Sequence, residues 1–66
     1  ETVTAYLYNN SITTYDSYGK DIGNISGNGT IKDFKFINGL LLVNITNNGK
    51  ESVKYYTPTG EEVNLF

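Results

Sequence analysis

The side chains that could carry acid–base or nucleophilic chemistry in this sequence lie beside turns. The carboxylates closest together are Asp16 and Asp21 in one stretch and Glu61 and Glu62 in another. General acid–base catalysis needs paired groups whose environments push their pKa values apart, and water around a turn makes such environments alike. The chain has no histidine and no cysteine, so its serines lack an imidazole base. We therefore expect no enzymatic activity.

Two of these carboxylates are candidate ligands for a metal ion. Asp16, Asp21 and the carbonyl groups of the intervening turn are the oxygen ligands that calcium prefers. Zinc is excluded because it needs cysteine or histidine. A cross-strand ion pair between Asp16 and Lys20, worth less than about 1 kcal/mol, explains the same residues better. We expect neither a metal nor a cofactor.

The charge balance excludes a nucleic-acid-binding protein. Five lysines stand against seven carboxylates, giving a net charge of −2, and the lysines are scattered with no arginine among them. The longest apolar run, residues 40–43, is far shorter than the roughly 18 residues that span a bilayer, so no membrane insertion is expected. Because the chain begins with Glu1, we expect a mature product or a fragment of a longer protein.

Four triplets fit the acceptor pattern for N-glycosylation. One interpretation is that a chain rich in asparagine and threonine produces them by accident. The other is that they are used, in which case the protein follows a secretory route and is extracellular or at the cell surface. Asn9 and Asn28 lie in predicted turns, where a glycan would fit, whereas Asn44 lies within a predicted strand. The candidate acceptors are Asn9, Asn24, Asn28 and Asn44.

The elements that position these residues are all predicted to be β-strands. β-Branched and aromatic residues recur in short runs separated by turn residues, and no segment has apolar residues at helical spacing. Short connections force neighbouring strands to be antiparallel. The sequence therefore predicts an all-β antiparallel meander of about seven short strands. The predicted strands cover residues 2–8, 11–16, 20–25, 30–37, 40–46, 50–57 and 61–65.

Turn residues predict the register of the C-terminal strands. A two-residue turn at Asn38-Gly39 places Phe36 opposite Leu41 and Phe34 opposite Val43. A three-residue loop at 47–49 would pair Val43 with Val53 and Leu41 with Tyr55. The turn at 58–60 would pair Tyr55 with Val63 and Val53 with Leu65. Together these registers predict one continuous apolar face.

The N-terminal strands are expected to form a similar hairpin with two different faces. A two-residue loop at 9–10 pairs Leu7 with Ile12 and Ala5 with Thr14, and the next turn places Thr14 opposite Ile22. The inner face then holds Val3, Ala5, Leu7, Ile12 and Ile22, and the outer face holds Thr4, Tyr6, Tyr8, Thr13 and Tyr15. Outward tyrosines can stack on sugar rings, or they can simply stabilise the sheet as a cross-strand ladder.

The first strand lacks the usual protection of a sheet edge. Residues 2–15 contain no charge, proline or glycine, whereas natural edge strands are normally blunted by such residues. Either the strand is covered within the domain or by flanking sequence, or it adds to the sheet of a neighbouring copy. In the second case Val3, Ala5 and Leu7 form the assembly strand.

An internal repeat relates the two halves of the chain. In sequence, residues 15–22 align with residues 56–63 at an offset of 41. Short strands with a period near 40 are typical of propeller blades. The matching positions are Ile12, Tyr15, Gly19 and Ile22 in the first unit and Val53, Tyr56, Gly60 and Val63 in the second.

On these residues the sequence resembles β-propeller repeats, such as the NHL-like and YVTN-like surface-layer repeats. The resemblance implies about one and a half blades, whereas a closed ring needs four to eight. The chain is then a piece of a propeller, a subunit whose copies assemble, or a different all-β fold. We expect one domain over residues 1–66, with possible half-repeats at 1–27 and 28–66.

Two functions fit these features. The first is a non-enzymatic extracellular or cell-surface structural protein, a self-assembling subunit of a fibre, sheath or surface array that joins other copies through exposed strands. The second is part of a β-propeller recognition module that binds carbohydrate or protein. The partner is the chain itself in the first case and carbohydrate or protein in the second.

Overall fold

The computed structural model describes residues 2–27 and 29–64 and contains seven strands over that part of the chain. The all-β prediction is confirmed, and the predicted strand ends differ from the observed ones by at most two residues wherever both ends are described. The described residues include no helix that is long and apolar enough to cross a membrane. The strands are β1 (Thr4–Tyr8), β2 (Ser11–Tyr15), β3 (Asp21–Ile25), β4 (Thr30–Ile37), β5 (Leu40–Asn47), β6 (Lys50–Tyr56) and β7 (Glu62–Val63).

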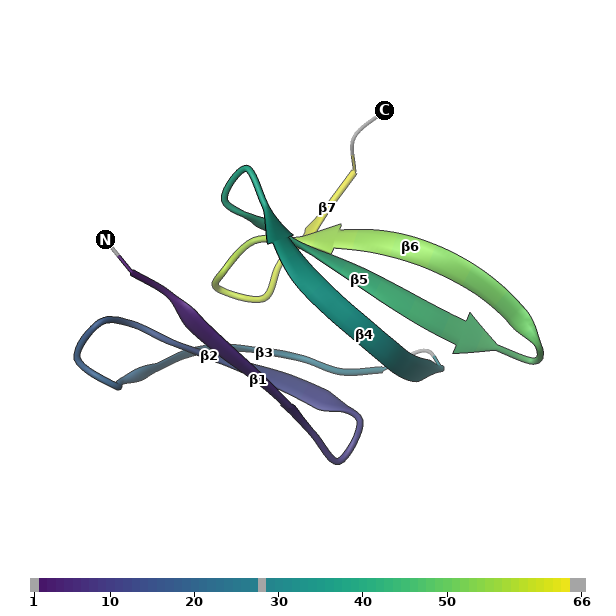
Figure 1. The fold of residues 1–66 in the computed structure, drawn as a ribbon, viewed down its shortest axis with the longest axis horizontal. Helices are drawn as coiled ribbons and strands as arrows, with labels where there is room; N and C mark the ends of the chain where they lie inside the picture. The colour runs from purple at the N-terminus through teal and green to yellow at the C-terminus, as the bar shows by residue number, and fades with distance from the viewer. Residues whose placement is uncertain (1, 28, 65–66) are drawn as a thin grey trace.

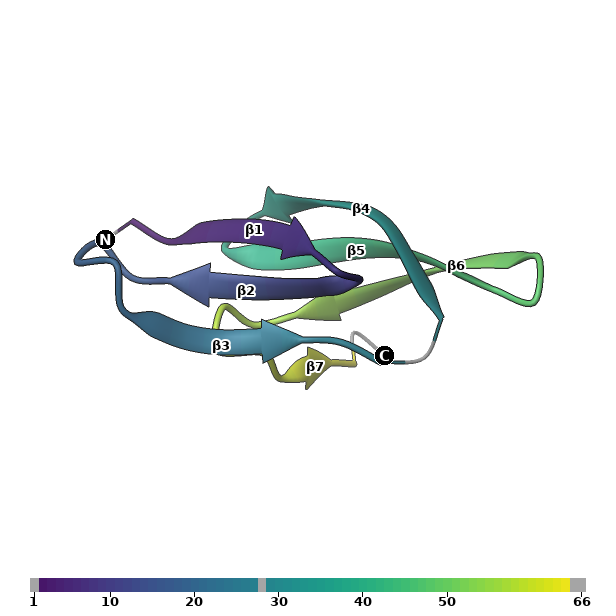
Figure 2. The ribbon, with the colours of Figure 1, turned by 90° about the horizontal axis from the view of Figure 1, so that it is seen from below.

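The strands form two antiparallel sheets that stack on each other. One sheet has the order β1-β2-β3 and the other has the order β4-β5-β6-β7. We call them the three-stranded sheet and the four-stranded sheet. Figure 1 shows the two layers nearly edge-on, and Figure 2 shows the three-stranded sheet in front of the other. In both views the far end of the β5–β6 hairpin extends beyond the three-stranded sheet.

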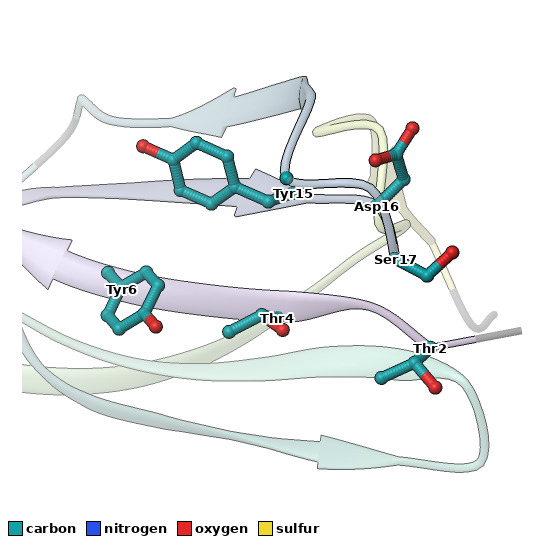
Figure 3. Close-up of a pocket in the computed structure, with 7 residues that line it drawn as sticks. Thr2, Thr4, Tyr6, Tyr15, Asp16 and Ser17 are labelled. Carbon is teal, nitrogen blue, oxygen red and sulfur yellow. The ribbon is translucent and has the colours of Figure 1, made fainter.

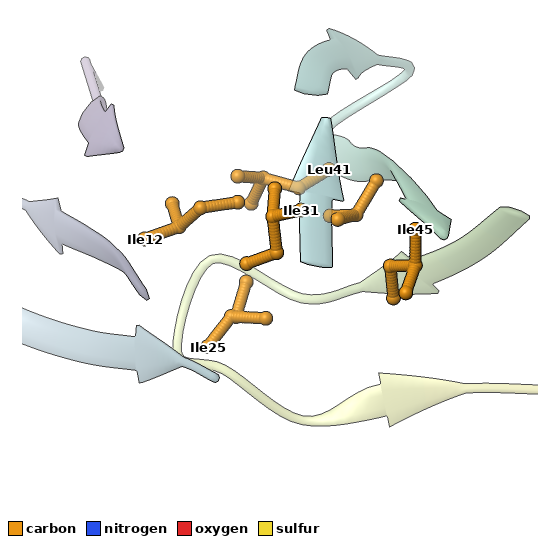
Figure 4. Close-up of a cluster of buried hydrophobic side chains, with 6 residues drawn as sticks. Ile12, Ile25, Ile31, Leu41 and Ile45 are labelled. Atoms are coloured by element: carbon orange, nitrogen blue, oxygen red, sulfur yellow. The ribbon is translucent and has the colours of Figure 1, made fainter. Parts of the chain in front are cut away.

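The core lies between the two sheets and is small. Ile12 and Ile25 project from the three-stranded sheet toward aliphatic side chains of β4 and β5 (Figure 4). Burial of one such side chain contributes about 1.5–3 kcal/mol. A core of this size gives a 66-residue chain limited stability. The buried apolar side chains of the described residues are Ile12, Ile25, Ile31, Leu41, Val43 and Ile45, with Ala5, Phe34 and Tyr56 packed against them.

Several predicted registers are confirmed. Leu7 lies opposite Ile12 and Ala5 opposite Thr14, as the loop at 9–10 requires. Asn9 and Asn10 both have positive φ, at 51° and 59°, which is the geometry of a type I′ turn. The Asn38-Gly39 turn places Phe36 opposite Leu41 and Phe34 opposite Val43, and Tyr55 lies opposite Val63.

The predicted pairing of β2 with β3 is wrong by one residue beyond the turn. Asp16 and Lys20 do meet, since the Asp16 N–H donates to the Lys20 carbonyl at 2.9 Å. A bulge then shifts the ladder, so that Thr14 lies opposite Gly23 and not opposite Ile22. The bulge adds one residue to β3. As a result Ile25 lies opposite Ile12, and it enters the core in place of Ile22, which was predicted for the inner face.

The predicted pairing of β5 with β6 is also wrong by one residue. Asn47 pairs with Lys50, so the loop has two residues, Asn48 and Gly49, in place of three. Both have positive φ, 53° and 78°, as a type I′ turn requires. A slip of one residue exchanges the two faces of a strand. Val43 therefore faces Lys54, and Val53 lies on the opposite face of the sheet from Val43.

The turn between β6 and β7 lies close against the backbone of the three-stranded sheet. Thr14 is fully buried, and its Oγ1 donates to the Pro58 carbonyl at 2.6 Å. A Cβ added to Gly23 would lie 2.6 Å from the Thr59 carbonyl carbon. Glycine is therefore required at position 23 by the close approach of another segment's backbone.

The two units of the internal repeat share one turn geometry. In the first turn the Gly19 N–H donates to Asp16, and in the second the Gly60 N–H donates to Thr57, both through backbone carbonyls. The residues 41 positions apart therefore make equivalent bonds. Residues 4–25 form one sheet and residues 30–63 the other. No propeller repeat is seen in the described part of the chain, and the propeller resemblance stays a prediction.

Candidate functional site

The outer edge of β1 presents unpaired main-chain groups. β1 pairs with β2 on one side and has no strand on the other within the described residues. The pair that closes a two-residue loop, Tyr8 and Ser11, is hydrogen-bonded, and such pairs alternate along an antiparallel ladder. The N–H and C=O groups of Ala5 and Leu7 therefore point away from β2. These four groups can pair with a strand of another molecule.

The three side chains of the predicted assembly strand face inward, toward the other sheet. Val3 and Ala5 are half-buried, and Leu7 is more exposed. Their alternation with Thr4, Tyr6 and Tyr8 agrees with the predicted faces. The contribution of this strand to assembly would therefore come from its backbone.

The other sheet edges are better protected than β1. β4 carries the exposed charges of Lys32, Asp33 and Lys35 and a bulge between Ile31 and Asp33. β7 has two residues, and β3 carries the exposed Asp21. Charges, bulges and short length are the devices that prevent edge-to-edge pairing. The contrast indicates that β1 is the edge best suited to pairing.

The outer face of the four-stranded sheet carries a group of apolar side chains beside Lys35 and Asp33 of β4, and the predicted registers did not place this group there. The register of β5 with β6 and of β6 with β7 places Val53, Tyr55 and Val63 on the face that points away from the three-stranded sheet. Val53 is 51% exposed. We call this surface the outer apolar face, and its members are Ile37, Leu40, Leu42, Val53, Tyr55 and Val63.

The outer face of the three-stranded sheet carries the predicted tyrosines. Tyr6 is 62% exposed and Tyr8 is 76% exposed. Tyr15 is half-buried, and its ring lies edge-to-face with that of Tyr6, with the ring centroids 6.0 Å apart and the planes at 65°. The structure thus brings Tyr6 and Tyr15 together. Tyr8 stands apart from this pair at the loop end of the hairpin.

An open hollow of about 590 Å³ lies beside the Tyr6–Tyr15 pair. Figure 3 shows the two rings toward one end and residues of the chain start and of the 16–19 turn toward the other. The carboxylate of Asp16 is held in place because its Oδ1 accepts the N–H groups of Tyr18 and Lys20, each at 2.9 Å. We call this hollow the tyrosine hollow. Its lining includes Tyr6, Tyr15, Thr2, Thr4, Asp16 and Ser17.

This turn corrects one prediction about charge. The Asp16 carboxylate bonds to backbone N–H groups of its own turn, and it makes no ion pair with Lys20 in the described structure. An aspartate that bonds its own turn is a common alternative to an ion pair. The described residues hold no group of three or more metal-binding side chains. The ion pairs that form are Lys32–Glu51 at 2.9 Å and Lys54–Glu62 at 3.3 Å.

Two side chains of the four-stranded sheet have shifted pKa values. The hydrogen bond and the charge of Glu51 raise the pKa of Lys32 above its usual value. Burial against the core raises the pKa of the Tyr56 phenol, and the nearby Glu62 carboxylate adds to the shift. Neither group lines the tyrosine hollow.

The candidate glycosylation sites differ in how their side-chain amides are used. Asn9 lies in the exposed β1–β2 turn, and no hydrogen bond of its side chain occurs within the described residues. The Asn24 amide donates to Ser11 and Thr13, at 2.8 and 3.1 Å, and the Asn44 amide donates to the Asp33 carboxylate. A glycan on either amide would disturb these bonds. Asn28 lies outside the described residues.

One asparagine beside these sites has a structural role that the sequence did not indicate. Asn10 Oδ1 accepts the Ile31 N–H at 2.7 Å, and its Nδ2 donates to the Gly29 carbonyl at 2.8 Å. These bonds fasten the β1–β2 turn to the start of β4. Nothing in the local sequence could reveal them, because the partners lie about twenty residues away.

Comparison of the chain with family models, with curated proteins and with solved structures gave no match.

Proposed function

We propose that this protein is a non-enzymatic structural subunit that joins further copies of itself at the cell surface or outside the cell. The observation that carries the proposal is the open, unprotected edge of β1. In such contacts the main-chain hydrogen bonds supply affinity and extend the sheet from one molecule into the next. If the contact repeats head to tail, the product is a fibre or an array.

The size of the β1 edge argues that a second surface takes part. The four outward groups of Ala5 and Leu7 contribute about 0.5–1.5 kcal/mol for each bond, or about 2–6 kcal/mol together. Association costs an estimated 4–15 kcal/mol in lost freedom of the molecules. Edge pairing alone is therefore too weak for a stable contact. The outer apolar face offers the missing free energy, because two sheets can pack face to face.

The location of the protein rests on the acceptor triplets. A glycan on Asn9 would sit at an exposed turn and would leave the described hydrogen bonds intact. Use of this site would require passage through a secretory route.

The edge contact is tested by two proline variants. Ala5→Pro removes an outward N–H of β1 without removing a bond to β2, and proline is tolerated at a sheet edge when its missing N–H faces solvent. Ser17→Pro is the control, because position 17 corresponds to Pro58 in the repeated turn. Sedimentation velocity and electron microscopy over a wide concentration range would follow assembly, and circular dichroism would follow folding.

We expect the parent chain and Ser17→Pro to form concentration-dependent assemblies and Ala5→Pro to stay folded and monomeric. A parent chain that remains monomeric at every concentration would overturn the proposal. So would a folded Ala5→Pro variant that assembles as the parent does.

The second surface is tested on β6, where neighbouring residues lie on opposite faces. Val53→Lys places a charge on the outer apolar face, and Ser52→Lys places the same charge on the other face of the same strand, where Ser52 is exposed. We expect Val53→Lys to weaken assembly and Ser52→Lys to leave it nearly unchanged. Equal effects of the two variants would show that the outer apolar face takes no part.

A further inference from the structure

We propose that the tyrosine hollow is a binding site for a neutral saccharide. The hollow has an exposed aromatic surface. Tyr6 and Tyr15 meet edge-to-face, so the two rings form a corner and do not shield each other completely. Tyr6 as a whole is 62% exposed and lines an open hollow. The C–H face of a sugar ring packs on such aromatic surfaces, and the phenol groups remain able to bond its hydroxyls.

The hollow also has a polar lining. The hydroxyls of Thr2, Thr4 and Ser17 lie around the hollow, together with the Asp16 carboxylate (Figure 3). Hydroxyl side chains both donate and accept hydrogen bonds, and a carboxylate accepts them. A ligand rich in hydroxyl groups can satisfy all of these at once. Asp16 Oδ2 accepts no hydrogen bond from the described residues, so it is available to a ligand hydroxyl.

The charge of the lining favours one class of saccharide over another. The described lining contains one carboxylate and no lysine. A sulfated or carboxylated sugar would meet Asp16 without a compensating cation, and like charges in one site repel each other. The hollow therefore favours uncharged sugars. It is open and shallow, so a single site would bind weakly, and tight binding would need several sites on one assembly.

A proline-rich peptide is the other ligand that tyrosine surfaces bind, through grooves that fit a polyproline helix. Such grooves are formed by aromatic rings that lie along the bound peptide. Here two rings meet at 65°, and Thr2, Thr4 and Ser17 add hydroxyl groups to the rest of the lining. This arrangement favours a polyhydroxylated ring over a peptide.

The test is a titration followed by heteronuclear NMR, which locates the site on the parent chain itself. The probes are the trisaccharides of glucose in α- and β-linkage, of mannose and of N-acetylglucosamine, with a sulfated disaccharide and a proline-rich peptide for comparison. The protein concentration is kept below that at which the chain assembles, so the result does not depend on the proposed self-association.

We expect at least one neutral trisaccharide to shift the resonances of Thr4, Tyr6 and Tyr15. Tyr6→Ala should weaken binding about tenfold, because an aromatic contact contributes about 0.5–1.5 kcal/mol beyond its buried area. Tyr6→Phe should keep most of the affinity. Tyr8→Ala is the matched control, since Tyr8 lies on the same strand and face but outside the lining.

Three results would overturn the inference: no neutral trisaccharide shifts the lining, the proline-rich peptide or the sulfated sugar binds there in preference, or Tyr8→Ala weakens binding as much as Tyr6→Ala. Should Tyr6→Ala fail to fold, the shifts mapped on the parent chain and the Tyr6→Phe variant still decide the question.

Discussion

Replacement of Asn10 by glycine tests how the two sheets are fastened together. Asn10 and Asn9 are the central residues of the same turn, and both have positive φ. Glycine adopts positive φ without strain, and Asn-Gly is the preferred dipeptide of this turn type. Judged by turn preference alone, Asn10→Gly should be neutral or stabilising. The structure predicts the opposite, because Asn10 bonds to Gly29 and Ile31.

The expected cost follows from these two bonds. Each contributes about 0.5–1.5 kcal/mol, and the Ile31 N–H, which belongs to a buried residue, costs more when it has no partner. We expect Asn10→Gly to lower the free energy of unfolding by about 2 kcal/mol. The whole chain has a stability of about 3–10 kcal/mol at its length. The melting temperature should then fall by about 8–16 °C.

Asn9→Gly is the matched control. It removes an asparagine from the same turn, at nearly the same φ, and breaks no side-chain bond within the described residues. Effects on the unfolded chain are similar for the two variants. Thermal and urea unfolding followed by circular dichroism would measure the difference in stability between the two variants. Faster hydrogen exchange of the Ile31 amide in Asn10→Gly would show that the loss arises at this bond. Equal stability of the two glycine variants would refute the reasoning.

Three further predictions concern the contact between the sheets and its dependence on pH. Gly23→Ala should destabilise the fold by about 1–3 kcal/mol, because the new Cβ would lie 2.6 Å from the Thr59 carbonyl carbon; urea unfolding at neutral pH would measure this, and an unchanged midpoint would contradict the close approach. Thr14→Val should cost about 1–3 kcal/mol in the same assay by leaving the Pro58 carbonyl without its donor, whereas Thr14→Ser should keep that bond. The raised pKa of Tyr56 means that the folded state holds the phenol proton more tightly than the unfolded state does. Its contribution to stability is therefore complete below the usual tyrosine pKa and is lost as the pH rises through the raised value. Urea unfolding at neutral and strongly alkaline pH should show a smaller alkaline loss for Tyr56→Phe than for the parent chain, and equal losses would argue against the shift.

The sequence predicted the strands and most turns because their signals are local. The dipeptide Asn38-Gly39 between two apolar runs is such a signal, and the structure confirms both the turn and the register that it sets. The loop at 47–49 offered the same dipeptide at Asn48-Gly49. A three-residue loop at 47–49 would instead give one continuous apolar face. That expectation fails because the four-stranded sheet carries apolar side chains on both faces, and alternation then cannot fix the register.

The candidate sites also divide into features that local sequence predicts and features that it does not. The outward tyrosines and the open edge of β1 follow from strand alternation and composition, which are local properties. The tyrosine hollow needs Thr2 and Ser17 to meet, and these residues are distant in the sequence. The fastening by Asn10 and the close approach at Gly23 depend on how the sheets stack. Such contacts between distant segments could not be predicted before the topology was known.

The polar residues Ser52 and Lys54 of β6 lie on the inner face of the four-stranded sheet. Lys54 lies on the same face as the buried Val43, yet it pairs with Glu62 at a partly exposed position. Ser52, on that same face, is exposed. This end of the hairpin extends beyond the three-stranded sheet (Figure 2). The inner face is thus polar at this end and suits water, whereas Phe36, on the same face of β4, is 42% exposed.

Val53 and Tyr55 alternate with these polar residues and face the opposite side. A solitary two-layer protein would gain stability from the reverse arrangement, with polar residues on its outer surface. In the observed arrangement Val53 is 51% exposed on the outer apolar face, and a second molecule packed on that face would remove it from water. A partner should therefore pack on the outer apolar face, while the β1 edge, at the margin of the other sheet, stays open to strand pairing.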